Sequence, residues 1–335
     1  MISMKRFKYI LKKLKTLDYK NMLEIADKIK FKTGKFKLFI LIDMVYCAIV
    51  HGSGYMDYFE FEFYLLSNKE RKTYITSSIN NSIIKKYNNN KYNYIFDNKA
   101  IFNDKFKNYL NREYINLENL MLDDFLKFAK NKNKIVVKPL NECGGKGVEI
   151  INLHKRTNHE KLFNSLIRNK QFLVEDYIEQ CKQMKALYKD SVNTLRILTF
   201  YKNGKVYILK SILKIGNGGV VDNFSSGGMY TFVNNDGVVY VPAIDEEGNI
   251  FENHPVSTKK IVGFQVPQYD KIKDFVIKLA KVVPQVRYVG WDIAVTSDGP
   301  AVVEGNNFSG IFQVKPSISG IKTGDLPNYR KYMDI

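Results

Sequence analysis

The sequence predicts an α+β protein built from antiparallel strands and amphipathic helices, preceded by a helical N-terminal region, and two observations favour this class. Two pairs of apolar segments flank Asn-Gly or Asp-Gly turns, as in β-hairpins: 194–201 with 205–213, and 290–296 with 300–305. Two further segments, 117–130 and 269–283, carry apolar residues at helical spacing.

Composition narrows the class of protein. The chain has 335 residues, of which 45% are hydrophobic, so it can bury a substantial core and is not disordered as a whole. Its three cysteines, Cys47, Cys143 and Cys181, form no CxxC motif, which excludes a disulfide framework and a structural zinc site. A reducing cytoplasm is therefore the expected location.

The longest apolar run, residues 38–50, contains Asp43. A helix that crosses a bilayer needs about 20 apolar residues, and this run is shorter. We therefore expect a buried helix here rather than a membrane span.

Positive charge is concentrated at the N-terminus. The formal net charge is +18, and residues 1–38 contribute +9 of it, from twelve Lys and Arg against three Asp and Glu. Apolar residues follow helical spacing between these lysines: Met4, Phe7, Ile10, Leu11 and Leu14. Such a basic amphipathic helix suits peripheral contact with an anionic membrane, but it could also pack on the protein's own core with its lysines in solvent. Binding to nucleic-acid phosphates is a third interpretation, although no nucleic-acid motif is recognisable.

A glycine-rich loop lies between two predicted strands, 134–139 and 148–153. Lys138 ends the first strand, and Gly144-Gly145-Lys146-Gly147 follows shortly after it. Backbone N–H groups of such a loop can approach phosphate oxygens closely. The loop fits neither a Walker A nor a Rossmann motif, because no helix follows it. A plain hairpin turn is the alternative.

The predicted strand 171–176 leads into a second candidate segment. Residues 175–178 could form a hinge whose backbone pairs with an adenine edge, and Glu179 could accept a ribose hydroxyl. An ordinary strand end would look the same in sequence.

The C-terminal hairpin carries three oxygen-bearing side chains. Its spacing places Asp292 opposite Glu304, and Asn306 shares the parity of Glu304, so all three can face one side of the sheet. Two carboxylates and an amide are ligands that Mg²⁺ prefers, and close carboxylates repel each other without a cation. Incidental acids on an exposed hairpin are the alternative.

The order of these elements resembles the ATP-grasp superfamily: Lys105 in NDKF, Lys138 in VVKP, the glycine loop, VEDYI, then Asp292, Glu304 and Asn306. Residues 191–228 and 290–307 are similar, more narrowly, to the sugar-transfer-associated ATP-grasp family of bacterial polysaccharide gene clusters. The resemblance covers roughly residues 40–325. It implies two α+β lobes whose antiparallel sheets clasp ATP.

The resemblance also implies roles for individual residues around ATP. Lys105 and Lys138 would contact the phosphates, under a lid loop of Gly144, Gly145, Lys146 and Gly147. Glu175, Asp176, Tyr177 and Ile178 would line the adenine pocket, with Glu179 at the ribose. Mg²⁺ would be held by Asp292, Glu304 and Asn306.

Catalytic and acceptor-side residues follow from the same resemblance. Arg196 would lie near the phosphates or the transferred carboxyl, and Lys214 stands where the family often has arginine. Lysine lacks the bidentate fork of arginine, so Lys214 would act as a point charge. Asn223, Gly227 and Gly228 would shape the acceptor side.

We expect three regions: a basic segment 1–38, a helical or mixed region 39–100 that ends in the Asn/Lys-rich run 85–96, and an ATP-grasp domain 101–335 with a lid lobe at about 117–180. The implied activity is ATP-dependent ligation of a carboxylate to an amine through an acyl phosphate. The substrates would be an amino acid or a sugar, in surface-polysaccharide synthesis. A kinase that phosphorylates a hydroxyl, and a non-catalytic membrane-docked or nucleic-acid-binding protein, remain open alternatives.

Overall fold

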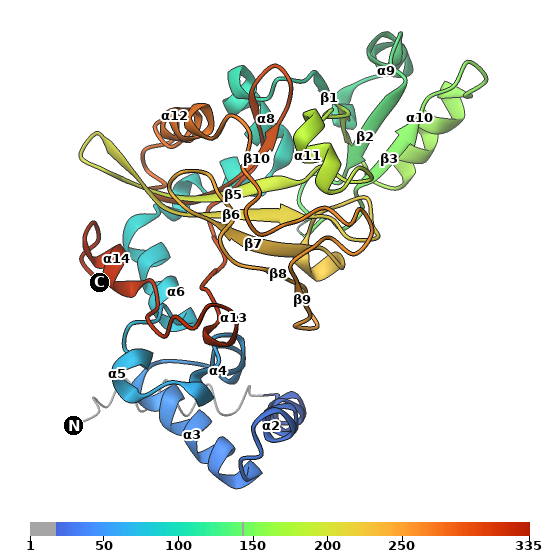
Figure 1. Cartoon of the computed structure of the whole chain (residues 1–335). Helices are drawn as coiled ribbons and strands as arrows, with labels where there is room; N and C mark the ends of the chain where they lie inside the picture. Colours follow the sequence, from blue (N-terminus) through green and yellow to red (C-terminus); the bar gives the residue numbers. More distant parts are fainter. Residues whose placement is uncertain (1–17, 143) are drawn as a thin grey trace. The chain divides into compact units, whose positions relative to one another are not determined.

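The computed structural model describes residues 18–142 and 144–335. The chain divides into two compact units (Figure 1): Met1–Ile83 together with Ile311–Ile335, and Ile84–Gly310. This division falls after Ile83, and residues 311–335 group with the N-terminal unit. The sequence predicted boundaries after residues 38 and 100 and kept residues 101–335 together.

The first unit is helical. Its helices are α2 (Tyr19–Thr33), α3 (Lys37–Val50), α4 (Tyr55–Glu60), η1 (Phe63–Leu65), α5 (Asn68–Arg71), α13 (Pro316–Ser319) and α14 (Leu326–Arg330), and α6 (Ser77–Tyr87) crosses the division. Asp18 caps α2 by accepting from the Asn21 N–H, and Gly34, with φ of 71°, ends it. Arg71 donates to both carboxylate oxygens of Asp43 at 2.7 and 2.6 Å, and the Tyr58 hydroxyl donates to the same carboxylate at 2.7 Å. Asp43 therefore ties α3 to the aromatic core of this unit.

The second unit contains a four-stranded antiparallel sheet in the order β1-β4-β2-β3. Its elements are β1 (Tyr114–Asn116), η4 (Leu117–Asn119), α9 (Leu122–Ala129), β2 (Lys134–Lys138), β3 (Glu149–Asn152), α10 (His159–Arg168) and β4 (Leu173–Asp176). Phe125 of α9 and Leu166 of α10 pack with Ile135, Val137 and Val174 into one buried cluster. This small lobe confirms the three predicted strands and places the glycine loop between β2 and β3.

The larger sheet of the second unit has seven antiparallel strands in the order β11-β10-β5-β6-β7-β8-β9. Its strands are β5 (Thr194–Lys202), β6 (Lys205–Ile215), β7 (Met229–Val233), β8 (Ala243–Ile244), β9 (Ile250–Phe251), β10 (Tyr288–Val295) and β11 (Pro300–Asn306). The helices of this part are η2 (Asn90–Tyr92), α7 (Tyr94–Asp97), α8 (Lys99–Phe106), η3 (Lys107–Tyr109), α11 (Lys182–Leu187), η5 (Phe224–Ser226) and α12 (Tyr269–Leu279). Trp291 is buried against Phe106 and donates its indole N–H to Thr199 at 2.8 Å. Both predicted hairpins are confirmed, and Asp292 lies opposite Glu304.

Two expectations about helices need correction. The predicted helix 117–130 begins as the separate 3₁₀ turn η4 before α9. The apolar run 38–50 does form a helix, but α3 buries only Ile40, Met44 and Cys47 and leaves much of its remaining surface in solvent. Of the helices in residues 18–142 and 144–335, none is long and apolar enough to cross a bilayer. The amphipathic helix predicted around Met4–Leu14 lies outside the described residues.

Candidate active site

A cavity in the second unit brings most of the predicted site residues together. Part of the lining, from the small lobe, is apolar or aromatic: Val136, Ile150, Tyr177 and Ile178. Charged and polar side chains come from both sheets, from helix α8 and from the loop after β6: Lys99, Lys138, Thr194, Lys214, Asp222, Asn223, Asp292 and Glu304. A lining that combines apolar and charged side chains suits a ligand with a flat aromatic ring and a charged tail.

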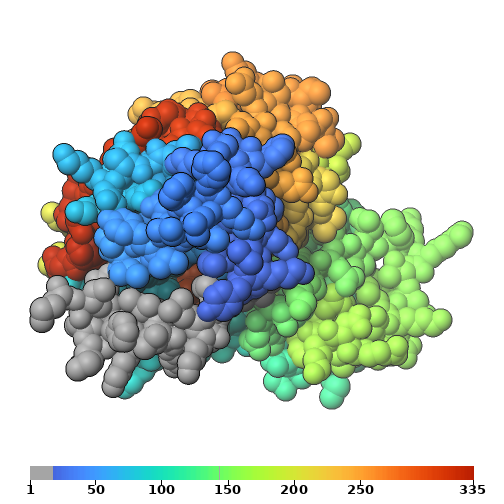
Figure 2. Space-filling view, turned by 90° about the horizontal axis from the view of Figure 1, so that it is seen from below, coloured from blue at the N-terminus to red at the C-terminus, as the bar shows by residue number. Residues whose placement is uncertain are grey.

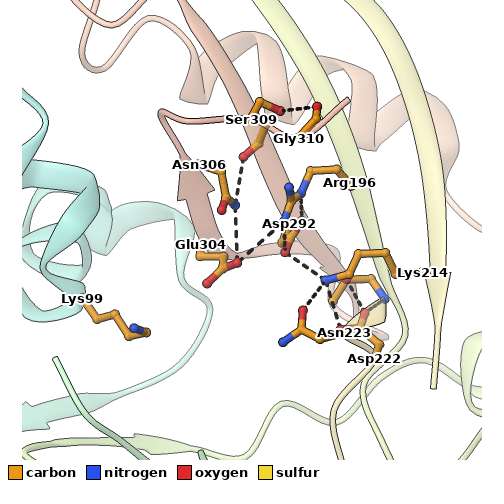
Figure 3. Close-up of polar contacts among 12 residues, drawn as sticks. Lys99, Arg196, Lys214, Asp222, Asn223, Asp292, Glu304, Asn306, Ser309 and Gly310 are labelled. Atoms are coloured by element: carbon orange, nitrogen blue, oxygen red, sulfur yellow. Dashed lines mark hydrogen bonds and ion pairs between the residues drawn. The ribbon is translucent and has the colours of Figure 1, made fainter. Parts of the chain in front are cut away.

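Several of the charged lining residues belong to a buried cluster of ion pairs centred on Asp292 (Figure 3). Register places Asp292 of β10 directly opposite Arg196 of β5. Arg196 pairs with Asp292 through Nε, and its Nη2 donates to Asp292 Oδ2 at 2.9 Å. Lys214 of β6 reaches the same oxygen at 3.2 Å. Adjacent strands thus supply two cations to one buried carboxylate.

The electrostatics of this cluster favour ionised groups. Burial alone would raise the pKa of Asp292, but Arg196 and Lys214 lower it below the ordinary range. Burial alone would lower the pKa of Lys214, but Asp222 and Asp292 raise it. The pKa of Glu304 is instead raised, by burial and by the neighbouring Asp292 charge. Glu304 is therefore the carboxylate of this cluster that an added cation would stabilise most.

Asp222 is a site residue that the sequence reasoning missed. It pairs with Lys214 at 3.2 Å, and it accepts from the Thr194 backbone N–H at 2.9 Å and from the Thr194 hydroxyl. The neighbouring Asn223 accepts from Lys214 at 3.1 Å, which agrees with its predicted place at the site. Asp222 lies in the segment on which the family resemblance rests, but no spacing rule distinguishes it from a loop acid.

A second buried ion cluster holds Lys138. Glu175 pairs with Lys138 through Oε2, while its Oε1 accepts from Arg112 at 2.8 Å and from Asn103 at 2.7 Å. Burial would raise the pKa of Glu175, but Arg112 and Lys138 lower it to about 2. The Glu175 carboxylate is thus committed to positioning Lys138. It lines the cavity as predicted, and its side chain is occupied by cations rather than offered to an adenine.

Helix α8 presents a different lysine to the cavity from the one that the sequence indicated. Lys99 lines the cavity and donates to the Glu142 carbonyl, whereas Lys105 is exposed and lies outside the lining residues. At about 100° per residue, six positions rotate a side chain by about 240° from its starting direction, so the two lysines face different sides. The phosphate contact assigned to Lys105 therefore suits Lys99 better.

Two of the four loop residues that were predicted to cover the phosphates line the cavity. Gly144 and Gly145 line the cavity, while Lys146 and Gly147 do not. Gly145 has φ of 76°, a left-handed conformation that favours glycine. A Cβ there would lie 2.7 Å from Asn223 Nδ2 and would push that side-chain amide aside.

The remaining predicted residues divide between the cavity and its surroundings. Tyr177, Ile178 and Asp176 line the cavity, whereas Glu179 lines a neighbouring polar depression. Gly227 and Gly228 do not line it, but a Cβ at Gly228 would lie 2.5 Å from the Asp222 carbonyl oxygen. Gly228 therefore allows the close backbone approach that holds the Asp222 loop.

The predicted magnesium ligands lie together at one edge of the cluster. Asn306 Nδ2 lies 3.4 Å from Glu304 Oε1, and Glu304 keeps 40% of its side-chain surface accessible. Within the described part of the chain no group of three or more His, Cys, Asp or Glu forms a metal cluster, so the candidate set is two carboxylates and an amide. The raised pKa of Glu304 and the oxygen ligands fit Mg²⁺.

Comparison with known proteins places this geometry in context. The model of the sugar-transfer associated ATP-grasp family matches residues 78–319. No curated protein matches the sequence.

Solved structures show similarity at low sequence identity. D-Alanine–D-alanine ligase from Bacillus anthracis has 13% identity and a TM-score of 0.40, over 75% of this chain and 70% of that one. L-Amino acid ligase from Bacillus licheniformis has 15% identity and a TM-score of 0.37, over 64% of this chain and 40% of that one. Phosphoribosylamine–glycine ligase from Thermotoga maritima has 14% identity and a TM-score of 0.40, over 64% and 48%. The chain thus spans less than half of the latter two structures.

The Glu175 cluster generates a stability prediction. Glu175→Gln leaves Arg112 and Lys138 without their buried counter-charge, so the free energy of unfolding should fall by about 3–5 kcal/mol at pH 7. Because the folded-state pKa of Glu175 is depressed, its contribution is complete above the ordinary carboxyl pKa of about 4.3 and is lost as the pH falls toward 2.

Urea unfolding at a series of pH values measures this difference. The gap between wild type and Glu175→Gln should be constant near neutrality and shrink below about pH 4. Glu160→Gln, at an exposed position on α10, is the matched control and should change stability little. A gap that stays constant down to pH 2 would show that the carboxylate charge is not the stabilising feature.

Proposed function

Because the chain belongs to the sugar-transfer associated ATP-grasp family, we propose that it is an ATP-dependent carboxylate–amine ligase that acts through an acyl phosphate. The observation that carries this proposal is the cavity of the second unit, where buried carboxylates hold three cations and part of the lining is apolar. Such an arrangement suits a nucleotide whose phosphates are to be attacked by an anion.

The residues of the cavity divide naturally over the parts of ATP. The adenine would lie against the apolar side chains of Val136 and Ile150, with the hinge backbone at Tyr177–Ile178 along its edge. Lys138 and Lys99 would contact the phosphates, under Gly144 and Gly145. Glu304, Asn306 and Asp292 would hold Mg²⁺, which neutralises phosphate charge when bound.

The buried cations would stabilise the charge that develops in the reaction. An oxygen of the substrate carboxylate attacks the γ-phosphorus of ATP, the bond from that phosphorus to the bridging oxygen breaks, and ADP leaves. Arg196 and Lys214 are already ionised and fixed by Asp292, so they can stabilise the developing anion without reorganisation. A free amine then attacks the acyl carbon, phosphate leaves, and the amine proton passes to the departing phosphate.

We further propose that the carboxylate and the amine come from an amino acid and a sugar, free or lipid-linked, in cytoplasmic steps of surface-polysaccharide assembly. The family's association with sugar transfer supports this substrate class. A screen of amino acids and amino sugars for dependent ADP release, with mass measurement of the products, tests it.

The intermediate provides the sharpest test of the reaction. Hydroxylamine converts an acyl phosphate into a hydroxamate but leaves a phosphoester unchanged. Hydroxamate should form only with ATP, Mg²⁺ and an accepted carboxylate, and Lys138→Ala should lower its rate by about a hundredfold or more, because a preorganised charge is lost. Thermal unfolding of the variant checks that it remains folded despite the change beside Glu175. A stable phosphorylated alcohol without hydroxamate would favour a kinase instead.

Magnesium dependence tests the metal assignment. Glu304→Ala removes one carboxylate from the proposed ligand set, so Mg·ATP should bind at least tenfold more weakly while metal-free ATP is affected less. Calorimetry with and without Mg²⁺ measures both affinities. Equal Mg·ATP affinity in wild type and variant would remove Glu304 from the ligand set.

Lys99 and Lys105 lie on the same helix, α8, so alanine variants of the two can serve as test and control. Lys99→Ala should weaken ATP binding about tenfold or more, because it removes a cation from the cavity wall, and Lys105→Ala should leave it within about twofold. Both variants lose one positive charge from the same helix, so long-range electrostatics are controlled. A larger loss in Lys105→Ala would restore the assignment made from the sequence.

A further inference from the structure

The turn between α2 and α3 exposes a group of large apolar side chains. We call residues 28–42, from the last turns of α2 to the middle of α3, the hairpin tip. Its apolar side chains Phe31, Phe36, Leu38, Phe39 and Ile42 are exposed by 94%, 75%, 65%, 65% and 56%. Soluble surfaces carry single exposed apolar residues, but here five fall within fifteen positions, and the rings of Phe36 and Phe39 lie 6.2 Å apart. Such a concentration of exposed apolar side chains is of the kind that marks an interaction site.

The hairpin tip is also strongly basic. Residues 28–42 contain five lysines and no Asp or Glu. Lys37 pairs with Asp27 at 2.7 Å and Lys35 donates to the Tyr64 carbonyl at 2.6 Å, whereas Lys28, Lys30 and Lys32 lie in the exposed part of α2. Lysines therefore alternate with the exposed phenylalanine Phe31 along one segment.

The rest of the first unit holds this segment in a defined conformation. Gly34 adopts φ of 71°, and its N–H donates to the Lys30 carbonyl at 2.8 Å, which closes α2 and sets the turn. Behind the turn, α3 is fixed by Asp43, whose carboxylate accepts two hydrogen bonds from Arg71. The fixed turn and helices therefore hold the phenylalanines in their exposed positions. Figure 2 shows α2 and α3, in blue, on the face turned to the viewer.

We propose that the hairpin tip docks on the surface of an anionic lipid bilayer. Phe31, Phe36 and Phe39 would enter the boundary between headgroups and acyl chains, and the lysines would meet the lipid phosphates. This inference goes beyond the proposed ligase activity, which requires no membrane.

The composition of the hairpin tip selects lipid over a protein partner. Protein interfaces are depleted in lysine, whereas interfacial membrane segments combine phenylalanine and leucine with lysine. The tip contains no acid, so its lysines, apart from Lys37 in its pair with Asp27, are complementary to an anionic surface. Six further Lys and Arg lie in residues 1–17, directly before α2 in the chain, and would add to the same attraction.

Tryptophan fluorescence offers a direct test with the full chain. Trp291 is the chain's single tryptophan and is buried, so it gives a constant background. In Phe31→Trp, vesicles containing phosphatidylglycerol should shift the emission to the blue, and brominated lipids should quench it. Met121→Trp, at another strongly exposed apolar position in the small lobe, is the control and should show neither effect.

Vesicle co-sedimentation separates the apolar from the electrostatic contribution. The wild type should bind phosphatidylglycerol-containing vesicles and release them at high salt, and should bind pure phosphatidylcholine weakly. Phe31→Ser/Phe39→Ser should weaken binding at least tenfold, and Lys30→Gln/Lys32→Gln should weaken it and flatten its salt dependence. Met121→Ser/Val256→Ser and Lys155→Gln/Lys161→Gln are the matched exposed controls.

Three results would overturn the proposal. The first is a wild type that ignores anionic vesicles at low salt. The second is Phe31→Ser/Phe39→Ser binding as tightly as wild type, with binding lost only on deletion of residues 1–17, which would assign it to that segment alone. The third is a wild type that dimerises in sedimentation while Phe31→Ser/Phe39→Ser stays monomeric and lipid has no effect, which would make a second copy the occupant. Ligase assays without vesicles, run on the same variants, keep these failures distinct from failure of the proposed function.

Discussion

The neutralisation of one buried carboxylate, Asp292, governs the arrangement of the larger sheet and of the candidate site. A buried charge without partners costs several kcal/mol, so the sheet must supply cations at fixed positions. Arg196 on the neighbouring strand β5 and Lys214 on the next strand, β6, do so. A shift of register by one residue would turn Arg196 to the other face of the sheet and leave Asp292 unpaired. The strand register therefore places the charges opposite each other, and their ion pairs in turn stabilise that register.

In the small lobe a second buried carboxylate, Glu175, is also neutralised by two cations. It pairs with Lys138, which lines the cavity, and with Arg112. Both clusters fix their cations through ion pairs within the protein, so the proposed reaction would need little reorganisation of these charges. Glu304 differs from these carboxylates, because burial and the neighbouring Asp292 charge raise its pKa. This difference supports the proposal that Glu304 is a ligand of Mg²⁺.

The sequence was sufficient for features that depend on local spacing. The hairpin through Asp298-Gly299, the pairing of Asp292 with Glu304 and the strand that ends at Lys138 are all confirmed. The resemblance to the ATP-grasp family is confirmed by the match over residues 78–319. Features that depend on side-chain direction or long-range packing were not accessible: the rotation of α8 decides between Lys99 and Lys105, and only the folded loop brings Asp222 to Lys214.

The apolar run 38–50 was predicted to be a buried helix, and its partial exposure supports the proposed membrane contact. Its apolar content suggested burial, yet α3 buries only Ile40, Met44 and Cys47. Exposing its other apolar side chains to water costs free energy unless another surface covers them. Phe36 and Phe39 also lie before residue 78, where the match to the family begins. The proposed contact with an anionic membrane would account for their exposure independently of the proposed reaction.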